Sequence, residues 1–278
     1  MDFEKLLRNT SKEGVVEGLA EFYEETQKEN KTKHLKHFQE ELKVSDILVA
    51  QYLLIGFALS TTTKEDKFSN RPLICENYMY TIVNNFHTLK SLFICGNHIQ
   101  FQLLLRSQFE FVLTFICALF DDDFFKTYTT PGIQEEAFPL TPSQSNRIKC
   151  LNRIFKALIP NKADKLFKQF HKMWFEMYQN LSEIGHGNIL RVFVQSFQKE
   201  DDGSLIPSYG GSDFPLGVTL NAFLGMLNYY QLVGRVLVDL IDKKQLINEE
   251  NVSFNFLKSN LNTIESFFLK EDAEQTDS

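Results

Sequence analysis

Residues 98 to about 120 are apolar on nearly every side of the helix that their pattern predicts, and this stretch most constrains the fold. A helix on the surface needs a polar face, so a helix with Leu and Phe all round must lie among other helices. Gly96-Asn97, just before it, is a suitable C-cap for a helix predicted over residues 73–95. The sequence therefore predicts a central buried helix.

Apolar residues recur at helical spacing through most of the remaining chain. Those between residues 15 and 42 are interrupted by KENKTK, which indicates either one long exposed helix or two short ones. The segment ILRVFVQSF (189–197) is compatible with a strand or a short helix. Further helices are expected at 47–59, about 145–158, 162–184, 218–246 and 250–269, with Ile159-Pro160-Asn161 separating the second from the third. We predict an all-α multi-helix bundle of eight or nine helices, with two long loops and at most one short strand pair.

Two linker-like stretches divide the chain. Residues 128–146 hold three of the seven prolines, and residues 198–217 form a second long loop rich in Gly and Ser. The predicted organisation is an N-terminal helical arm (1–44), a central bundle that carries the candidate site (45–197), the loop (198–217), C-terminal helices that pack on the bundle (218–270) and an acidic tail (271–278).

Several function classes are disfavoured by the sequence. The opening residues 1–14 are charged and lack an apolar core, so we expect no targeting segment and a cytoplasmic protein. Residues 214–234 carry no charge but include one Pro and three Gly, which favours a helix buried in protein and no membrane association. The four cysteines lie 20, 22 and 33 residues apart without a C-x-x-C pair, so neither a metal site nor a cofactor is predicted. Asp121-Asp122-Asp123 is expected to cap the next turn, and His34 and His37 to lie on a solvated face.

The first candidate site lies within the apolar helix, where Arg106 and Glu110 are one turn apart. A guanidinium stays charged, so its burial requires a carboxylate or phosphate partner. The order Arg then Glu is the weaker one for a pair within a helix, which leaves room for partners from another element or a ligand. The sequence leaves open whether the two residues are structural or functional.

The second candidate site is the segment WFEMYQNLSEIGHGN, in which Trp174, Tyr178, Ser182 and His186 recur every four residues and so share one stripe of a helix. Glycines flank His186, and Asn188 follows, so a ligand can approach closely. Histidine titrates near neutral pH and can serve as a general acid or base. We take Tyr178, Ser182 and Asn188 as candidate binding residues, while a simple helix C-cap remains the other interpretation.

The charge distribution changes sharply just before this segment. Residues 147–172 contain eight basic residues and one acidic residue, a net charge of +7 in a chain whose total is -7. Lys165, Lys168 and Lys172 follow helical spacing and would line one exposed face that binds RNA or another phosphate-bearing ligand. An ordinary solvated lysine face is the alternative.

The pairing of LLRSxFE (Leu104 to Glu110) with the later LSEIGHGN (Leu181 to Asn188) resembles uncharacterised bacterial helical proteins similar to the HEPN superfamily. That resemblance implies an all-helical protein of a phage-defence or toxin system, and a metal-independent endoribonuclease site completed in a homodimer. No Arg lies four to six residues before any of the six His, so the family's Arg-His motif is lacking. We expect instead a composite site in which Arg106 and Glu110 of one helix meet His186 from another. The alternative is a noncatalytic helical interaction or sensor subunit of a defence complex.

Overall fold

The structure is a computed structural model that describes residues 12–60, 71–129, 142–185, 197–199, 205–207 and 217–261. Within these residues it contains nine helices and one pair of short strands. They are α2 (Lys12–His37), α3 (Gln39–Ser60), α4 (Arg71–Ile94), α5 (His98–Phe120), α6 (Asp122–Thr129), α7 (Gln144–Leu158), α8 (Ala163–Gly185), β1 (Phe197–Lys199), β2 (Leu205–Pro207), α10 (Gly217–Lys244) and a last helical stretch over 252–261. The predicted all-α multi-helix bundle is confirmed.

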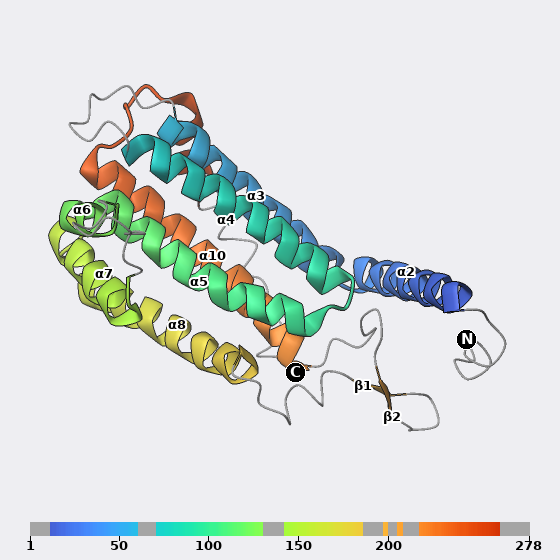
Figure 1. The fold of residues 1–278 in the computed structure, drawn as a ribbon. Helices are drawn as coiled ribbons and strands as arrows, with labels where there is room; N and C mark the ends of the chain where they lie inside the picture. Colours follow the sequence, from blue (N-terminus) through green and yellow to red (C-terminus); the bar gives the residue numbers. More distant parts are fainter. Residues whose placement is uncertain are drawn as a thin grey trace, which may run out of the picture.

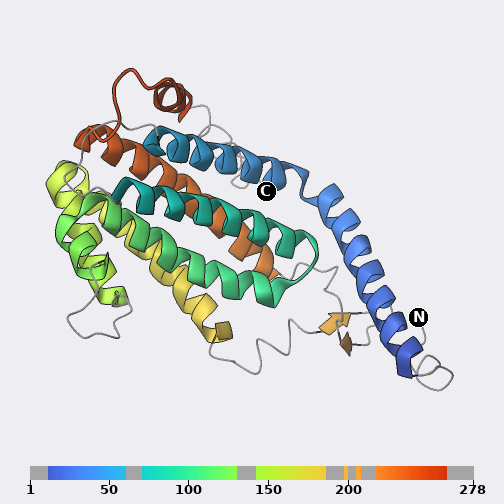
Figure 2. The same ribbon diagram turned by 45° about the horizontal axis from the view of Figure 1, so that its top comes forward.

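The bundle is built around α5 and α10, which lie side by side in its middle (Figure 1). Helices α3 and α4 cover one side of this pair, and α7 and α8 cover the other. Helix α2 extends away from the bundle, as the turned view in Figure 2 also shows. Because α5 contacts α4, α6, α7, α8 and α10, it has the central position that its apolar sequence predicted.

Aromatic side chains make up a large part of the core, and 13 of the 27 phenylalanines of the chain are buried among the described residues. Phe93 of α4 stacks on Phe223 of α10 with ring centroids 4.0 Å apart. Phe109 of α5 meets Tyr229 of α10 edge to face at 4.2 Å, and all four rings are fully buried. Each such ring contributes about 1.5–3 kcal/mol by leaving water, so these contacts hold the two central helices and α4 together.

The ends of the helices follow local signals in the sequence. Gly96 takes a φ of 76°, and the N–H groups of Gly96 and Asn97 donate to the carbonyls of Phe93 and Leu92. This Schellman pattern confirms the predicted C-cap of α4. Pro160 lies in the turn between α7 and α8, as expected of a residue that cannot continue a helix.

The acidic run after α5 caps α6 as predicted. Asp121 lies between the two helices, and its Oδ1 accepts the backbone N–H of Phe124 at 2.8 Å. Its Oδ2 accepts Arg153 of α7 at 2.6 Å, and this hydrogen bond raises the pKa of the guanidinium. Asp121 therefore ties α6 to α7.

Three local features differ from the sequence expectations or add to them. The first two helices are separated at Phe38, and KENKTK lies inside α2. His34, expected on a solvated face, is only 2% exposed, and its Nδ1 lies 3.0 Å from the carbonyl of Ile94. Residues 197–199 and 205–207, in and beside the predicted loop 198–217, form an antiparallel pair.

Two helices, α3 and α5, are long and apolar enough to cross a membrane by length and composition. Within the window that meets this criterion, 56% of α3 and 61% of α5 is buried inside the structure. A core helix passes the same criterion, so this observation is weak evidence for a membrane span.

Candidate functional site

Arg106 and Glu110 of α5 are bridged by Tyr178 of α8. The Tyr178 hydroxyl donates to Glu110 Oε1 at 2.9 Å, and Arg106 Nη2 donates to the Tyr178 oxygen at 3.2 Å. The guanidinium carbon of Arg106 also lies 5.1 Å from the centroid of the Tyr178 ring, within cation–π distance. The structure thus brings together three of the predicted site residues.

A second arginine forms an ion pair with the other carboxylate oxygen of Glu110. Arg147 Nη1, from α7, lies 3.4 Å from Glu110 Oε2, and Arg147 Nε donates to Thr114 Oγ1 at 2.8 Å. Only 6% of Arg147 is exposed, so this residue, one of the eight basic residues counted over 147–172, does not belong to an exposed basic surface. We call Arg106, Glu110, Thr114, Arg147 and Tyr178 the α5 polar network.

The α5 polar network fixes three helices to one another. Both carboxylate oxygens of Glu110 accept hydrogen bonds, and the Tyr178 hydroxyl both donates and accepts. Arg106 is half-buried and makes one hydrogen bond to the described residues, although a guanidinium has five N–H donors. Of the network, Arg106 is therefore the residue best able to bind an additional anion.

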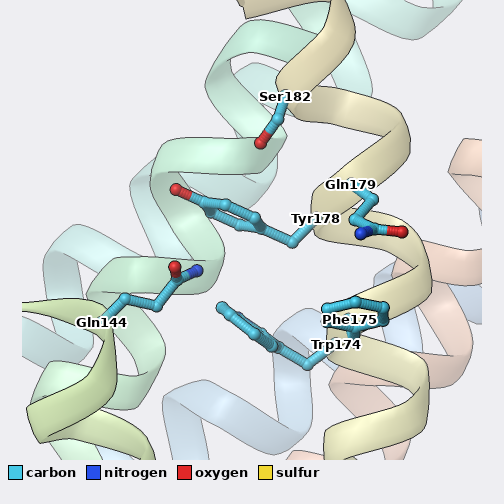
Figure 3. Close-up of a pocket in the computed structure, with 6 residues that line it drawn as sticks. All are labelled: Gln144, Trp174, Phe175, Tyr178, Gln179 and Ser182. Atoms are coloured by element: carbon cyan, nitrogen blue, oxygen red, sulfur yellow. The ribbon is translucent and has the colours of Figure 1, made fainter.

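A cavity of about 460 Å³ lies beside Tyr178, between α8 and the first turn of α7. Figure 3 shows Gln144 reaching from α7 toward the aromatic side chains of α8. Phe175 and Gln179 are exposed, so the cavity opens to solvent. The lining residues are Gln144, Trp174, Phe175, Tyr178, Gln179 and Ser182. The predicted stripe of Trp174, Tyr178 and Ser182 therefore lies along a cavity.

Three polar atoms around this cavity are buried and have no hydrogen-bond partner among the described residues. They are Gln144 Nε2, Trp174 Nε1 and Ser182 Oγ. A buried polar group left without a hydrogen bond costs about 1–3 kcal/mol. Gln144 was not predicted as a site residue, because it lies within the predicted linker 128–146 and no local pattern relates it to α8.

The surface of α8 carries a continuous stripe that ends at this cavity. Successive members are three or four residues apart, so they are neighbours along one side of the helix. They are Lys165, Lys168, Lys172, Phe175, Gln179 and Ser182, and all except the half-buried Ser182 are exposed. We call this set the α8 stripe.

The charges of the α8 stripe are largely free of ion pairs within the described residues. Lys172 lies 4.0 Å from Glu176, but its side chain is 76% exposed, so this contact is weak. Phe175 is 45% exposed and stacks on His171 at 5.9 Å between ring centroids. The predicted lysine face thus exists, and an exposed aromatic ring adjoins it. Of the eight basic residues counted before, Arg147 and Arg153 are held in ion pairs instead.

Two predicted site residues, His186 and Asn188, lie outside the described residues. Helix α8 ends at Gly185, the residue before His186. The pairing of Arg106 with His186 stays a prediction. Within the described part of the chain, no group of three His, Cys, Asp or Glu side chains is arranged to hold a metal ion.

Compared with protein-family models, curated proteins and solved structures, the chain matches none of them.

Proposed function

We propose that the chain is a HEPN-like, RNA-directed protein of a bacterial phage-defence or toxin system, which binds single-stranded RNA along the α8 stripe. The observation that carries this proposal is the stripe itself, in which three exposed lysines lead to an exposed phenylalanine and an aromatic cavity. Proteins that bind single strands combine cations for the phosphates with aromatic rings for the bases. The α8 stripe offers both along one helix.

The proposed chemistry is metal-independent cleavage of the RNA. In such a reaction the ribose 2′-oxygen attacks phosphorus, the bond to the 5′-oxygen breaks, and a proton moves from the first oxygen to the second. His186 would move this proton, and Arg106 would stabilise the charge of the phosphorane. The spare donors of Arg106 support the proposal, and so does the place of His186 in the sequence, directly after the last residue of the helix that carries the stripe.

A noncatalytic interaction or sensor subunit of a defence complex is the second candidate function. The observation that favours it is the occupation of both Glu110 oxygens, which gives this residue a structural role. In either function we propose a cytoplasmic protein that acts as a homodimer or with a defence-complex partner.

RNA binding is tested by fluorescence anisotropy with a labelled oligonucleotide at several salt concentrations. We expect Lys168→Gln/Lys172→Gln to weaken binding and to reduce the slope of log K against log salt by about 1.4, the contribution of two phosphate contacts to a single strand. The matched control is Lys36→Gln/Lys43→Gln, which removes the same charge from exposed positions on α2 and α3. Equal losses in both variants would contradict binding at the stripe, and no binding by the parent protein at low salt would refute the proposed function.

Catalysis is tested by RNA integrity and host growth on expression of the parent protein beside His186→Ala and Arg106→Lys. We expect the parent protein to degrade RNA and to arrest growth, and we expect His186→Ala to abolish both effects. Circular dichroism shows whether both variants fold. Arg106→Lys keeps the positive charge while removing the planar set of donors, and we expect partial activity. Intact RNA with the parent protein, despite oligonucleotide binding, would favour the noncatalytic subunit.

A further inference from the structure

We propose that α4 and α5 together form the surface on which two copies of this chain pair, an inference that rests on the homodimer put forward in the proposed function. The surface consists of the exposed residues between Asn77 and Ser91 of α4 and between Gln100 and Ser107 of α5. We call this set the α4–α5 face. In both ribbon views α4 and α5 run side by side, with α10 on their far side and no other described element over them (Figures 1 and 2).

The α4–α5 face differs from the other helix surfaces in its lack of charge. None of its nine exposed residues is Asp, Glu, Lys or Arg, whereas five of the eight exposed residues of α8 are. Lys90 of α4 is half-buried at the border with α3, where it pairs with Asp46. Surfaces that bind another protein are depleted of charged residues at their centre. In a chain that is 23% charged, an exposed surface of two helices without a charge therefore indicates a protein interface.

The side chains of the α4–α5 face are suited to burial against a protein. The hydroxyl of Thr88 donates to a backbone carbonyl of its own helix at 3.0 Å, and that of Ser107 does the same at 3.4 Å. These two groups therefore depend little on water. Tyr80 is 37% exposed and Leu103 is 41% exposed, and both add apolar surface. Removing this face from water thus costs less than removing a charged helix surface.

The α4–α5 face is also a preformed surface of adequate size. Asn85 Nδ2 donates to Gln108 Oε1 at 2.8 Å, and Gln108 Nε2 donates to the carbonyl of Ile82 at 3.1 Å, which locks α5 to α4. The two helices have 24 and 23 residues. At 1.5 Å per residue, and with helix axes about 10 Å apart, the face measures roughly 35 by 20 Å, or about 700 Å². Stable protein complexes bury about 800 Å² on each partner.

A second copy of the chain fits this face by its charge and its hydrogen-bonding groups. Each copy carries a net charge of -7, so two copies repel each other least where a neutral surface meets a neutral surface. A side-chain amide both donates and accepts hydrogen bonds. Asn77, Asn84 and Gln100 can therefore pair with the same residues of a copy, which a patch of one charge sign cannot do.

The two apolar side chains of the face define how the copies are related. Leu103 lies near the turn that joins α4 to α5, and Tyr80 lies toward the other end of the face, because the two helices are antiparallel. A two-fold axis midway between these residues places Tyr80 of each copy on Leu103 of the other. Such a symmetric interface contains every contact twice.

The test is analytical ultracentrifugation of the full chain at about 1–100 µM, since interfaces of this size reach micromolar affinity or better. We expect the parent protein to dimerise, and Leu103→Asp to weaken the dimer about a hundredfold, because the interface contains the substitution twice and each copy costs about tenfold. The matched control is Leu35→Asp on α2, where the leucine has the same exposure of 41%, and it should dimerise like the parent protein. A parent protein that is monomeric at about 100 µM, or equal dimerisation of the two variants, would overturn the inference.

A mixing experiment tests the two-fold arrangement. Tyr80→Lys alone should also weaken the dimer, because it buries two unpaired ammonium groups. Mixed with Leu103→Asp, it should restore a dimer, since the new carboxylate then meets the new ammonium at one contact while the other contact keeps its original residues. No recovery in the mixture, after a loss in each variant alone, would overturn the contact of Tyr80 with Leu103.

Salt separates this dimer from one that joins oppositely charged surfaces. Salt screens the repulsion between two copies of net charge -7, so the dimer should become tighter between about 50 and 500 mM NaCl. Dissociation of the dimer by salt would overturn the inference. Binding of a labelled RNA oligonucleotide is measured on the same samples. A salt-stable dimer that binds no RNA would refute only the proposed function, whereas RNA binding by a protein that stays monomeric would refute only the α4–α5 face as a dimer interface.

Discussion

Replacement of Glu110 by Gln tests whether the α5 polar network stabilises the folded chain as its geometry implies. The substitution keeps the shape of the side chain but removes its charge. Glu110 Oε1 and Oε2 both accept hydrogen bonds, from Tyr178 and Arg147 respectively. An amide has only one oxygen, so it can accept from only one of these two partners, and its NH₂ group faces the other. Arg147, with a side chain only 7% exposed, then lacks a negative partner.

The expected cost follows from the burial of the two partners. Breaking a fully buried ion pair by removal of one partner costs about 3–5 kcal/mol. The Glu110 side chain is 34% exposed, and water therefore screens the interaction. Thr114 also continues to accept from Arg147 Nε. We therefore expect about 2 kcal/mol, which corresponds to a fall in Tm of about 4–8 °C for a chain of this size.

The assay is urea and thermal unfolding followed by circular dichroism. The control is Asp46→Asn, which breaks the surface pair of Asp46 with Lys90, where Asp46 is 61% exposed and the expected loss is below about 1 kcal/mol. An Arg147→Met variant and the double variant complete a thermodynamic cycle, in which the double variant should lose less than the sum of the single variants. A Glu110→Gln protein as stable as Asp46→Asn would refute the structural role of Glu110.

Two further predictions concern packing and pH. A Cβ on Gly234 would lie 2.6 Å from Nε2 of Gln51, and Gln51 is only 2% exposed, so its amide has little room to move away. Gly234→Ala should therefore lower the free energy of unfolding by about 1–3 kcal/mol. Gly56→Ala, with its nearest contact at 3.7 Å, should raise the free energy of unfolding by up to about 1 kcal/mol. Equal effects of the two substitutions in urea titrations would contradict this difference. Burial raises the pKa of Tyr229 and Tyr230, so these residues stay protonated in the folded chain where the unfolded chain ionises. The contribution of these tyrosines to the free energy of unfolding is fully present below about pH 10, the ordinary pKa of tyrosine. It is lost as the pH rises above this value. Urea titrations from neutral to alkaline pH should show this decline, and a constant stability would oppose it.

The parts of the fold that depend on local patterns could be predicted from the sequence. Apolar residues on every side of residues 98–120 indicated the central helix, and Gly96 and Pro160 marked where α4 and α7 end. The break between α2 and α3 was not visible in the same way. KENKTK is polar, but Lys and Glu are good helix formers, and the chain bends instead where Phe38 enters the core.

The candidate site was predictable only along single helices. The spacing of Trp174, Tyr178 and Ser182 on α8 placed them on one side, and they line one cavity. Contacts between helices were not predictable in this way. A count of charges along the chain included Arg147 in the basic segment 147–172, but it could not show that Glu110 and Thr114 of another helix hold this arginine in the interior. Gln144 reaches the cavity from α7, and no pattern in its own segment indicates that contact.

Trp174 is the single tryptophan of the chain, and it lines the cavity between α7 and α8. Excitation at the red edge of protein absorption selects indole over tyrosine, so the intrinsic fluorescence of the unmodified protein originates from this one position. A ring stacked against Trp174 would change both the intensity and the emission maximum. The chain thus carries its own optical reporter of cavity occupancy, with which mixtures of small molecules can be screened without a label and before any ligand is known.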